Sequence, residues 1–86
     1  MKLKEGFVLR EVAGDTVVIP SGDTLDLNMM ITLNETGRFL WTHLEKGADR
    51  EELVKALTQE YEVSAEDAGL HIDKFVEKLD ENGLLA

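Results

Sequence analysis

Residues 26–44 place a strand pattern directly before a helix pattern, and this junction limits the folds open to the chain. Apolar side chains first alternate along the sequence, as on one face of a β-strand, at Leu27, Met29, Ile31 and Leu33. They then recur at the spacing of one helical face, at Phe39 or Leu40, Trp41 and Leu44. The pattern predicts a strand joined to a helix without a loop, which is a place where an extended peptide can dock.

Two further strands are expected before this junction. Gly6–Val12 reads as a first strand, and Thr16–Ile19 is β-branched throughout, which favours a second strand. The turn residues Ala13-Gly14-Asp15 between them predict a hairpin. Pro20 cannot donate to a ladder, so the second strand should end there. The third strand, Leu27 to Thr32 or Leu33, then completes an antiparallel meander, and we expect it at the sheet edge.

Three helices are expected after the sheet. The first begins near Asn34, or at Thr32 with Glu35 three residues later, and ends before Gly47. The capping-box pattern of Asp49–Glu52 opens a second helix.

The second helix should end around Glu60 or Tyr61, and Ser64–Asp67 then caps a third helix that Asn82-Gly83 stops. Residues of the third helix expected to face inward are Ala65, Ala68, Ile72, Phe75 or Val76, and Leu79. Residues 1–86 are therefore predicted to form a single α+β domain of winged helix-turn-helix-like character, with a three-stranded antiparallel sheet followed by three helices.

Composition excludes several classes of function. The chain has no cysteine, which removes disulfides, thiolate nucleophiles and cysteine-based metal sites. Catalytic triads, Gly-rich phosphate loops and zinc motifs are also missing, so we expect no enzyme activity, metal or cofactor. No apolar run approaches the roughly 20 residues of a membrane span, and the N-terminal residues lack the apolar core of a signal peptide, so we expect a cytoplasmic protein.

Charge argues against nucleic acid as a partner. The net charge is −9, whereas proteins that bind duplex DNA neutralise phosphates with clusters of Lys and Arg. Residues 1–33 hold three basic and five acidic side chains, and residues 34–86 hold six and thirteen. The helical part, which would have to meet DNA, is thus the more acidic part.

Two stretches are candidates for a binding site. The edge segment Asn28–Thr32 contains neither charge nor proline, although natural proteins usually protect an edge with one of them. On the third helix a basic flank adjoins the apolar stripe, at His71, Lys74, Phe75 and Lys78. This flank is either an ordinary solvated helix rim or a wall for a ligand with apolar and acidic side chains.

The sequence resembles a known family through residues spread over nearly its whole length. The most specific part is Ile31–Gly37, followed by Phe39-Leu40-Trp41, Leu44 and Gly47. Further matches are Leu53-Val54, Leu57, Glu60-Tyr61, Phe75, Leu79 and Gly83-Leu84-Leu85. On these residues it is similar to the PqqD-like proteins, the RiPP recognition elements, which are peptide-recognition domains of ribosomally made and modified peptide (RiPP) pathways.

The resemblance implies three antiparallel strands packed on three helices and a cytoplasmic, non-catalytic role. Members of the family bind the leader segment of a precursor peptide as a strand added to the third strand, beside the third helix. They present it to a modifying enzyme, often a radical S-adenosylmethionine maturase. Carried over to this sequence, the peptide-binding positions are Asn28, Met29, Met30, Ile31 and Thr32 on the edge, and His71, Lys74, Phe75 and Lys78 on the helix.

Two other functions remain open at the level of sequence. A winged-helix DNA-binding or transcription-regulator domain has a compatible order of elements, although its charge is unfavourable. A structural subunit that dimerises through the same edge strand is the other alternative. The resemblance does not identify the pathway, because Leu33–Gly37 is a general structural signature of the family.

Overall fold

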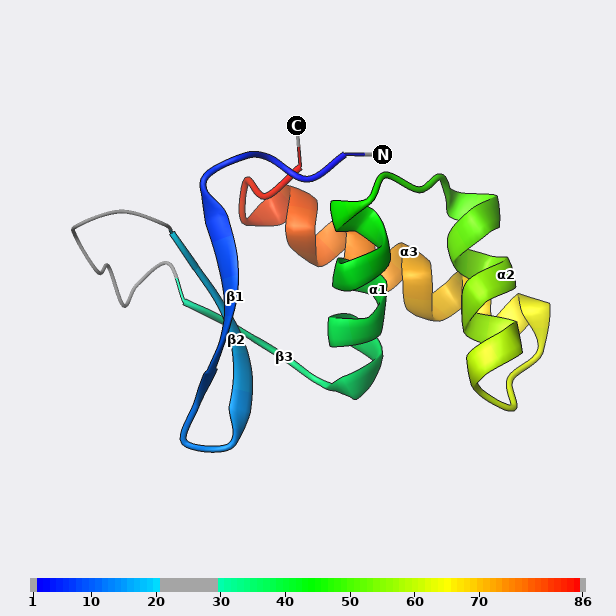
Figure 1. Cartoon of the computed structure of the whole chain (residues 1–86). Helices are drawn as coiled ribbons and strands as arrows, with labels where there is room; N and C mark the ends of the chain where they lie inside the picture. The colour runs from blue at the N-terminus through cyan, green and yellow to red at the C-terminus, as the bar shows by residue number, and fades with distance from the viewer. Residues whose placement is uncertain (1, 21–29, 86) are drawn as a thin grey trace.

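The computed structural model describes residues 2–20 and 30–85 and contains three strands followed by three helices (Figure 1). The strands β1 (Phe7–Val12), β2 (Asp15–Pro20) and β3 (Ile31–Leu33) form an antiparallel sheet in the order β1-β2-β3. The helices are α1 (Glu35–Glu45), α2 (Arg50–Glu60) and α3 (Ala65–Glu81). The predicted α+β fold class is confirmed, and β3 lies at an edge of this sheet.

The strand boundaries differ slightly from the predicted ones. β1 begins one residue later than predicted, and β2 extends by one residue at each end, so that Pro20 is its last residue. Pro20 can occupy a strand end because only its missing N–H is incompatible with a ladder. Of the predicted third strand, Ile31–Leu33 is observed as β3, and residues 27–29 lie outside the described residues.

The β1–β2 connection is a tight two-residue turn. Val12 pairs with Asp15, which leaves only Ala13 and Gly14 between the strands. Their φ angles are 52° and 86°, and positive φ at both central residues is what a type I′ hairpin turn requires. This turn fixes the hairpin register, which brings Asp15 to the end of β2.

Each helix begins at a polar side chain that accepts a main-chain N–H. Asn34 accepts from Gly37 N at 2.7 Å, Ser64 accepts from Asp67 N at 3.1 Å, and Asp49 forms a complete capping box with Glu52. The predicted helix starts at Asn34, Asp49 and Ser64 are therefore confirmed. Asn34 is the only residue between β3 and α1, so the cap itself joins the strand to the helix.

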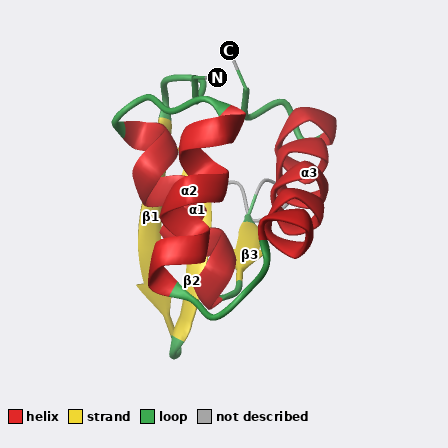
Figure 2. Cartoon of the chain, turned by 90° about the vertical axis from the view of Figure 1, so that its right-hand side faces the viewer, coloured by secondary structure: helices red, strands yellow, loops and turns green. Residues whose placement is uncertain are grey.

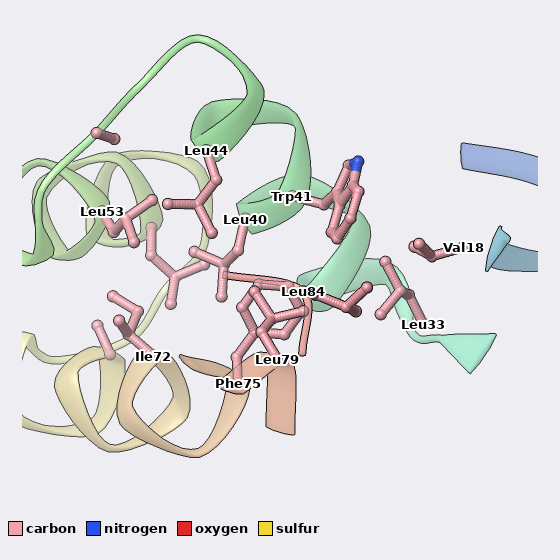
Figure 3. Packing of buried hydrophobic residues seen from close by; sticks show 13 residues of the cluster. Val18, Leu33, Leu40, Trp41, Leu44, Leu53, Ile72, Phe75, Leu79 and Leu84 are labelled. Carbon is pink, nitrogen blue, oxygen red and sulfur yellow. The ribbon is translucent and has the colours of Figure 1, made fainter. Parts of the chain in front are cut away.

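One apolar core is formed mostly among the three helices and extends to the sheet at Val18 and Leu33 (Figure 3). Trp41 and Leu40 of α1 are 2% and 1% exposed, and each such side chain contributes about 1.5–3 kcal/mol by leaving water. The buried cluster consists of Val18, Leu33, Leu40, Trp41, Leu44, Ala48, Leu53, Leu57, Ala68, Ile72, Phe75, Leu79 and Leu84. The prediction that Ala65 faces inward was wrong, because this residue borders an open hollow between α2 and α3.

The helices are arranged so that α3 is available to the sheet edge. α1 lies between the sheet and α2 (Figure 1), whereas α3 lies alongside β3 (Figure 2). The chain ends meet at one end of the domain, where Lys4 N donates to Leu84 O at 2.7 Å and Leu3 pairs with Leu85. Among the helices of the described residues, none has the length and apolar character that a membrane crossing needs.

Candidate functional site

A cleft of about 610 Å³ opens between β3 and α3, the two elements that lie side by side in Figure 2. The first residues of α1 and the β1–β2 end of the sheet complete its wall. The lining residues are Asp15, Thr32, Leu33, Asn34, Thr36, Gly37, Leu40, His71, Lys74, Phe75 and Lys78.

The structure brings five of the nine predicted site residues into this cleft. Four of them are the α3 positions His71, Lys74, Phe75 and Lys78, and the fifth is Thr32 of β3. The flank of α3 identified in the sequence is therefore the flank that faces the edge strand. A peptide-binding role for these side chains stays a prediction.

The remaining four predicted residues do not line the cleft or lie outside the described residues. The half-buried Ile31 side chain packs against the core, and Met30, just before β3, is 39% exposed. Asn28 and Met29 fall in residues 21–29, which the structure does not describe. On the strand side, the predicted residue that lines the cleft is Thr32.

The main chain of Thr32 faces α3. Its carbonyl oxygen accepts a hydrogen bond from Lys78 Nζ at 3.2 Å, across 46 positions of sequence. In an antiparallel pair, main-chain bonding groups point alternately toward and away from the partner strand. The neighbouring residues Ile31 and Leu33 therefore direct their main-chain groups to β2, and Thr32 presents its own to the cleft.

The floor of the cleft is apolar and closely packed. Phe75 is 8% exposed and Leu40 is 1% exposed, and both belong to the core and line the cleft. Gly37 permits this packing, since a Cβ at that position would stand 3.3 Å from Phe75 Cε1 and 3.2 Å from Asn34 Oδ1. A ligand side chain that enters the cleft would meet an aromatic surface held by the first turn of α1.

Several of the lining residues were not identified as site residues from the sequence, because their residue types already fitted another role. Asn34 was predicted as a helix cap, and this role is confirmed. The apolar face of the first helix was predicted at Phe39 or Leu40, and of the two it is Leu40 that is buried in the core. Asp15 was predicted as a turn residue. It reaches the cleft because Thr16 pairs with Leu33, which places the preceding residue beside the β3–α1 junction. The register of the hairpin could have identified Asp15 as a cleft residue, but only if the pairing of β2 with β3 had also been known.

The charges in the cleft are unevenly distributed. His71, Lys74 and Lys78 line its α3 side, and Asp15 is the acidic residue on the sheet side. The whole chain carries a net charge of −9, so a cleft wall with two lysines departs from the rest of the molecule. Such a wall favours acidic groups on a ligand that approaches α3.

The second histidine belongs to a separate aromatic group on α1. The rings of His43 and Phe39 have centroids 4.6 Å apart, and Tyr61 meets Phe39 edge-on at 5.6 Å. Burial, followed by the charges of Glu35 and Glu60, raises the pKa of the Tyr61 hydroxyl. Within residues 2–20 and 30–85, no three His, Cys, Asp or Glu side chains are grouped so that they could hold a metal ion.

Comparison with known proteins gives one family and two solved structures. The family model described as coenzyme PQQ synthesis protein D (PqqD) matches residues 7–85. The structure of TbiB1 in complex with the TbiA(beta) leader peptide is similar, with a TM-score of 0.80, 26% identity, and coverage of 99% of this chain and 94% of TbiB1.

The second similar structure is lasso peptide synthetase B1 complexed with the leader peptide. Its TM-score is 0.74 at 27% identity, over 96% of this chain and 93% of the synthetase chain. No curated protein sequence matches this chain.

These comparisons give no support to the DNA-binding alternative. The charges on α3 agree with them, because this helix carries more acidic than basic side chains. Its acidic residues are Glu66, Asp67, Asp73, Glu77, Asp80 and Glu81. A recognition helix of that composition would repel the phosphate backbone that gives DNA-binding proteins most of their affinity.

Proposed function

The chain belongs to the PqqD family, and on that premise we propose that it is a peptide chaperone that binds the leader segment of a ribosomally made precursor peptide. The observation that carries the proposal is the edge position of β3 in the described sheet, beside a cleft walled by α3. Further support comes from the two similar structures, both complexes with leader peptides, which align with nearly the whole chain.

The mechanism of binding is strand addition. The leader pairs its main chain with β3 at Thr32, whose main-chain groups point away from β2, and this pairing supplies affinity that depends little on sequence. Alternate leader side chains then point into the cleft toward Phe75 and the α3 flank, which supplies specificity. The predicted edge positions Asn28, Met29, Met30 and Ile31 would extend this pairing along the strand.

The bound leader is then presented to a modifying enzyme. The chaperone performs no chemistry itself, and the partner enzyme, of the radical S-adenosylmethionine class or another maturase, acts on the part of the precursor that the cleft does not hold. We place this step in the cytoplasm, where ribosomes make the precursor. The charge and shape of the cleft are used for recognition alone.

An NMR titration tests the proposal. The precursor is sought among the genes adjacent to this one, and its leader is added to the isotope-labelled protein. We expect the amides of residues 30–34 and 71–78 to shift, with the amides of β1, on the opposite edge of the sheet, as an internal control. Shifts confined to β1 or α2, or no shifts at all, would contradict the proposal.

Light scattering at several protein concentrations distinguishes a monomer that binds a leader from a subunit that dimerises through β3. We expect the mass of one chain throughout, because the β3 edge is reserved for the leader. A mass that doubles with concentration, and returns to one chain when leader is added, would instead show that two copies pair through this edge.

A further inference from the structure

We propose that Lys78 protects the β3 edge through its hydrogen bond to the Thr32 carbonyl, a contact that we call the latch. The latch makes the protein selective for leaders that place an acidic side chain beside α3. This inference rests on the proposed function and concerns the chemistry of the leader segment that is accepted. It is carried by the bond between the Lys78 ammonium and the Thr32 carbonyl.

The latch occupies the group that strand addition requires. Within β3, Thr32 presents its main chain to the cleft, and its carbonyl oxygen accepts from Lys78 Nζ at 3.2 Å. A leader strand that pairs at this position brings its own N–H to the same oxygen. Binding therefore weakens or breaks the contact with Lys78.

The released ammonium of the exposed Lys78 turns either to water or to an acceptor on the ligand. Lys78 lies beside the ring of Phe75 at the cleft wall, where an apolar ligand side chain would offer no hydrogen-bond acceptor. The bond to the Thr32 carbonyl is already charge-assisted by the ammonium, and a carboxylate would add a full negative charge on the acceptor side, so that an ion pair replaces a contact between an ion and a dipole. An acidic leader thus forms an ion pair with the released ammonium, whereas a neutral leader leaves the ammonium to water.

The ion pairs of the described residues leave the two lysines of the cleft available to a ligand carboxylate. Among the described residues, the ion pairs are Arg38–Glu11 and Arg50–Asp73, and neither includes Lys74 or Lys78. The two lysines are one helical turn apart and line the same wall. Because Asp15 lies on the sheet side, the leader carboxylate is expected at the α3 side, near Thr32.

The latch also explains how an uncharged edge strand is protected. Natural sheets commonly place a lysine on an edge strand to prevent unwanted pairing. Here Ile31–Leu33 has no charge of its own, and the lysine reaches the edge from α3. A chance strand that lacks a carboxylate would have to compete with this contact, so the same side chain rejects wrong partners and accepts the right one.

Peptide selection tests the latch without knowledge of the natural leader. A random peptide library displayed on phage is selected in parallel with the wild-type protein and with Lys78→Met, which keeps the length of the apolar stem but removes the charge. We expect Asp or Glu to be enriched at one fixed distance from the apolar anchors in the wild-type pool. This enrichment should vanish in the variant pool, while the apolar anchors remain.

The affinities of one matched pair of peptides show whether Lys78 strengthens the binding of an acidic peptide and weakens that of a neutral one. The probe is a synthetic peptide from the wild-type pool, together with its Glu→Gln or Asp→Asn analogue. We expect the acidic peptide to bind the wild type roughly fivefold more tightly than Lys78→Met. The neutral analogue should bind Lys78→Met at least as tightly as the wild type, because the variant has no latch to open. Lys55→Met, an exposed lysine change on α2 away from this cleft, should alter neither affinity.

The outcomes separate the latch from the proposed function. Selected peptides that shift the amides of residues 30–34 and 71–78, but show no acidic preference and no loss with Lys78→Met, would overturn the latch alone. Selected peptides that leave those amides unchanged, or a selection that yields no peptide, would overturn the proposed function and the latch with it. A charge swap, with Lys78→Glu and a peptide in which lysine replaces the acid, should restore the affinity lost by either change alone.

Discussion

Gly37, in the first turn of α1, lies so close to Phe75 of α3 that a Cβ at position 37 would stand 3.3 Å from the Phe75 ring. The same Cβ would also be 3.2 Å from Asn34 Oδ1, and that atom is held by its bond to Gly37 N. The angle between α1 and α3, and hence the width of the cleft, thus depends on the absence of a side chain at one residue.

Gly37→Ala should destabilise the protein by about 1 kcal/mol. Overpacking typically costs about 1–3 kcal/mol, whereas the helix propensity of alanine returns up to about 1 kcal/mol. The ring of Phe75 is the neighbour able to move, and it should move toward the cleft. Urea unfolding gives the stability, and the ring resonances of Phe75 give the displacement. An increase in stability with unchanged resonances would contradict the prediction.

Gly69→Ala, unlike Gly37→Ala, should stabilise the protein, by about 0.5 kcal/mol. Its Cβ would stand 2.8 Å from Arg50 Nη2, which is the mobile end of an exposed side chain. Moving that guanidinium disturbs the Arg50–Asp73 ion pair, but exposed pairs contribute only about 0.2–1 kcal/mol, and alanine gains up to about 1 kcal/mol over glycine in a helix. Urea unfolding of both alanine variants measures their free energies of unfolding. If both variants lost stability by a similar amount, the prediction for Gly69→Ala would be refuted.

The Arg50–Asp73 pair should appear in the acid titration of the protein. The hydrogen bond from Arg50, together with its positive charge, holds the pKa of the Asp73 carboxyl below its ordinary value of 3.8. A lowered folded-state pKa stabilises the fold above pH 3.8, and this contribution disappears as pH falls through the folded-state value. Arg50→Met should return the pKa toward 3.8, as measured by NMR of the carboxyl carbon.

The stability difference between wild type and Arg50→Met should shrink as the pH is lowered through this range, because protonated Asp73 no longer favours the folded state. Lys55→Met, on the same helix, serves as the control for loss of one positive charge. An equal response of Asp73 to both changes would mean that general charge, rather than the Arg50 contact, sets its pKa.

Thr32→Pro should abolish leader binding and preserve the fold. Thr32 directs its main chain to the cleft, so a proline there removes no bond to β2 and is tolerated as edge prolines are. It does remove the N–H that an added strand must use. We expect a loss of about tenfold or more in leader affinity by calorimetry, with a circular dichroism spectrum like that of the wild type.

Ile31→Pro is the matched control for that experiment. The main chain of Ile31 faces β2, and its side chain packs against the core, so proline there should lower the stability markedly. Equal stability of the two proline variants would show that the main-chain direction assigned to β3 is wrong. Full leader affinity in Thr32→Pro would exclude strand addition at this residue.

Local signals in the sequence accounted for most of the fold. The β-branched run of β2, the turn at Ala13-Gly14 and the caps at Asn34, Asp49 and Ser64 each act within a few residues, so they can be recognised without a structure. The wrong assignment of Ala65 has the same origin, because a helical period marks a face of a helix but not where the neighbouring element stops covering it.

The sequence by itself determined a strand joined to a helix by Asn34, and a basic flank on α3. Only the tertiary structure decided that this flank faces β3, that Gly37 seats the ring of Phe75, and that Lys78 reaches the carbonyl of Thr32. The physical reason is distance along the chain. Periodicity and capping depend on neighbours, whereas a contact across 46 positions depends on how the core sets the angle between helix and sheet.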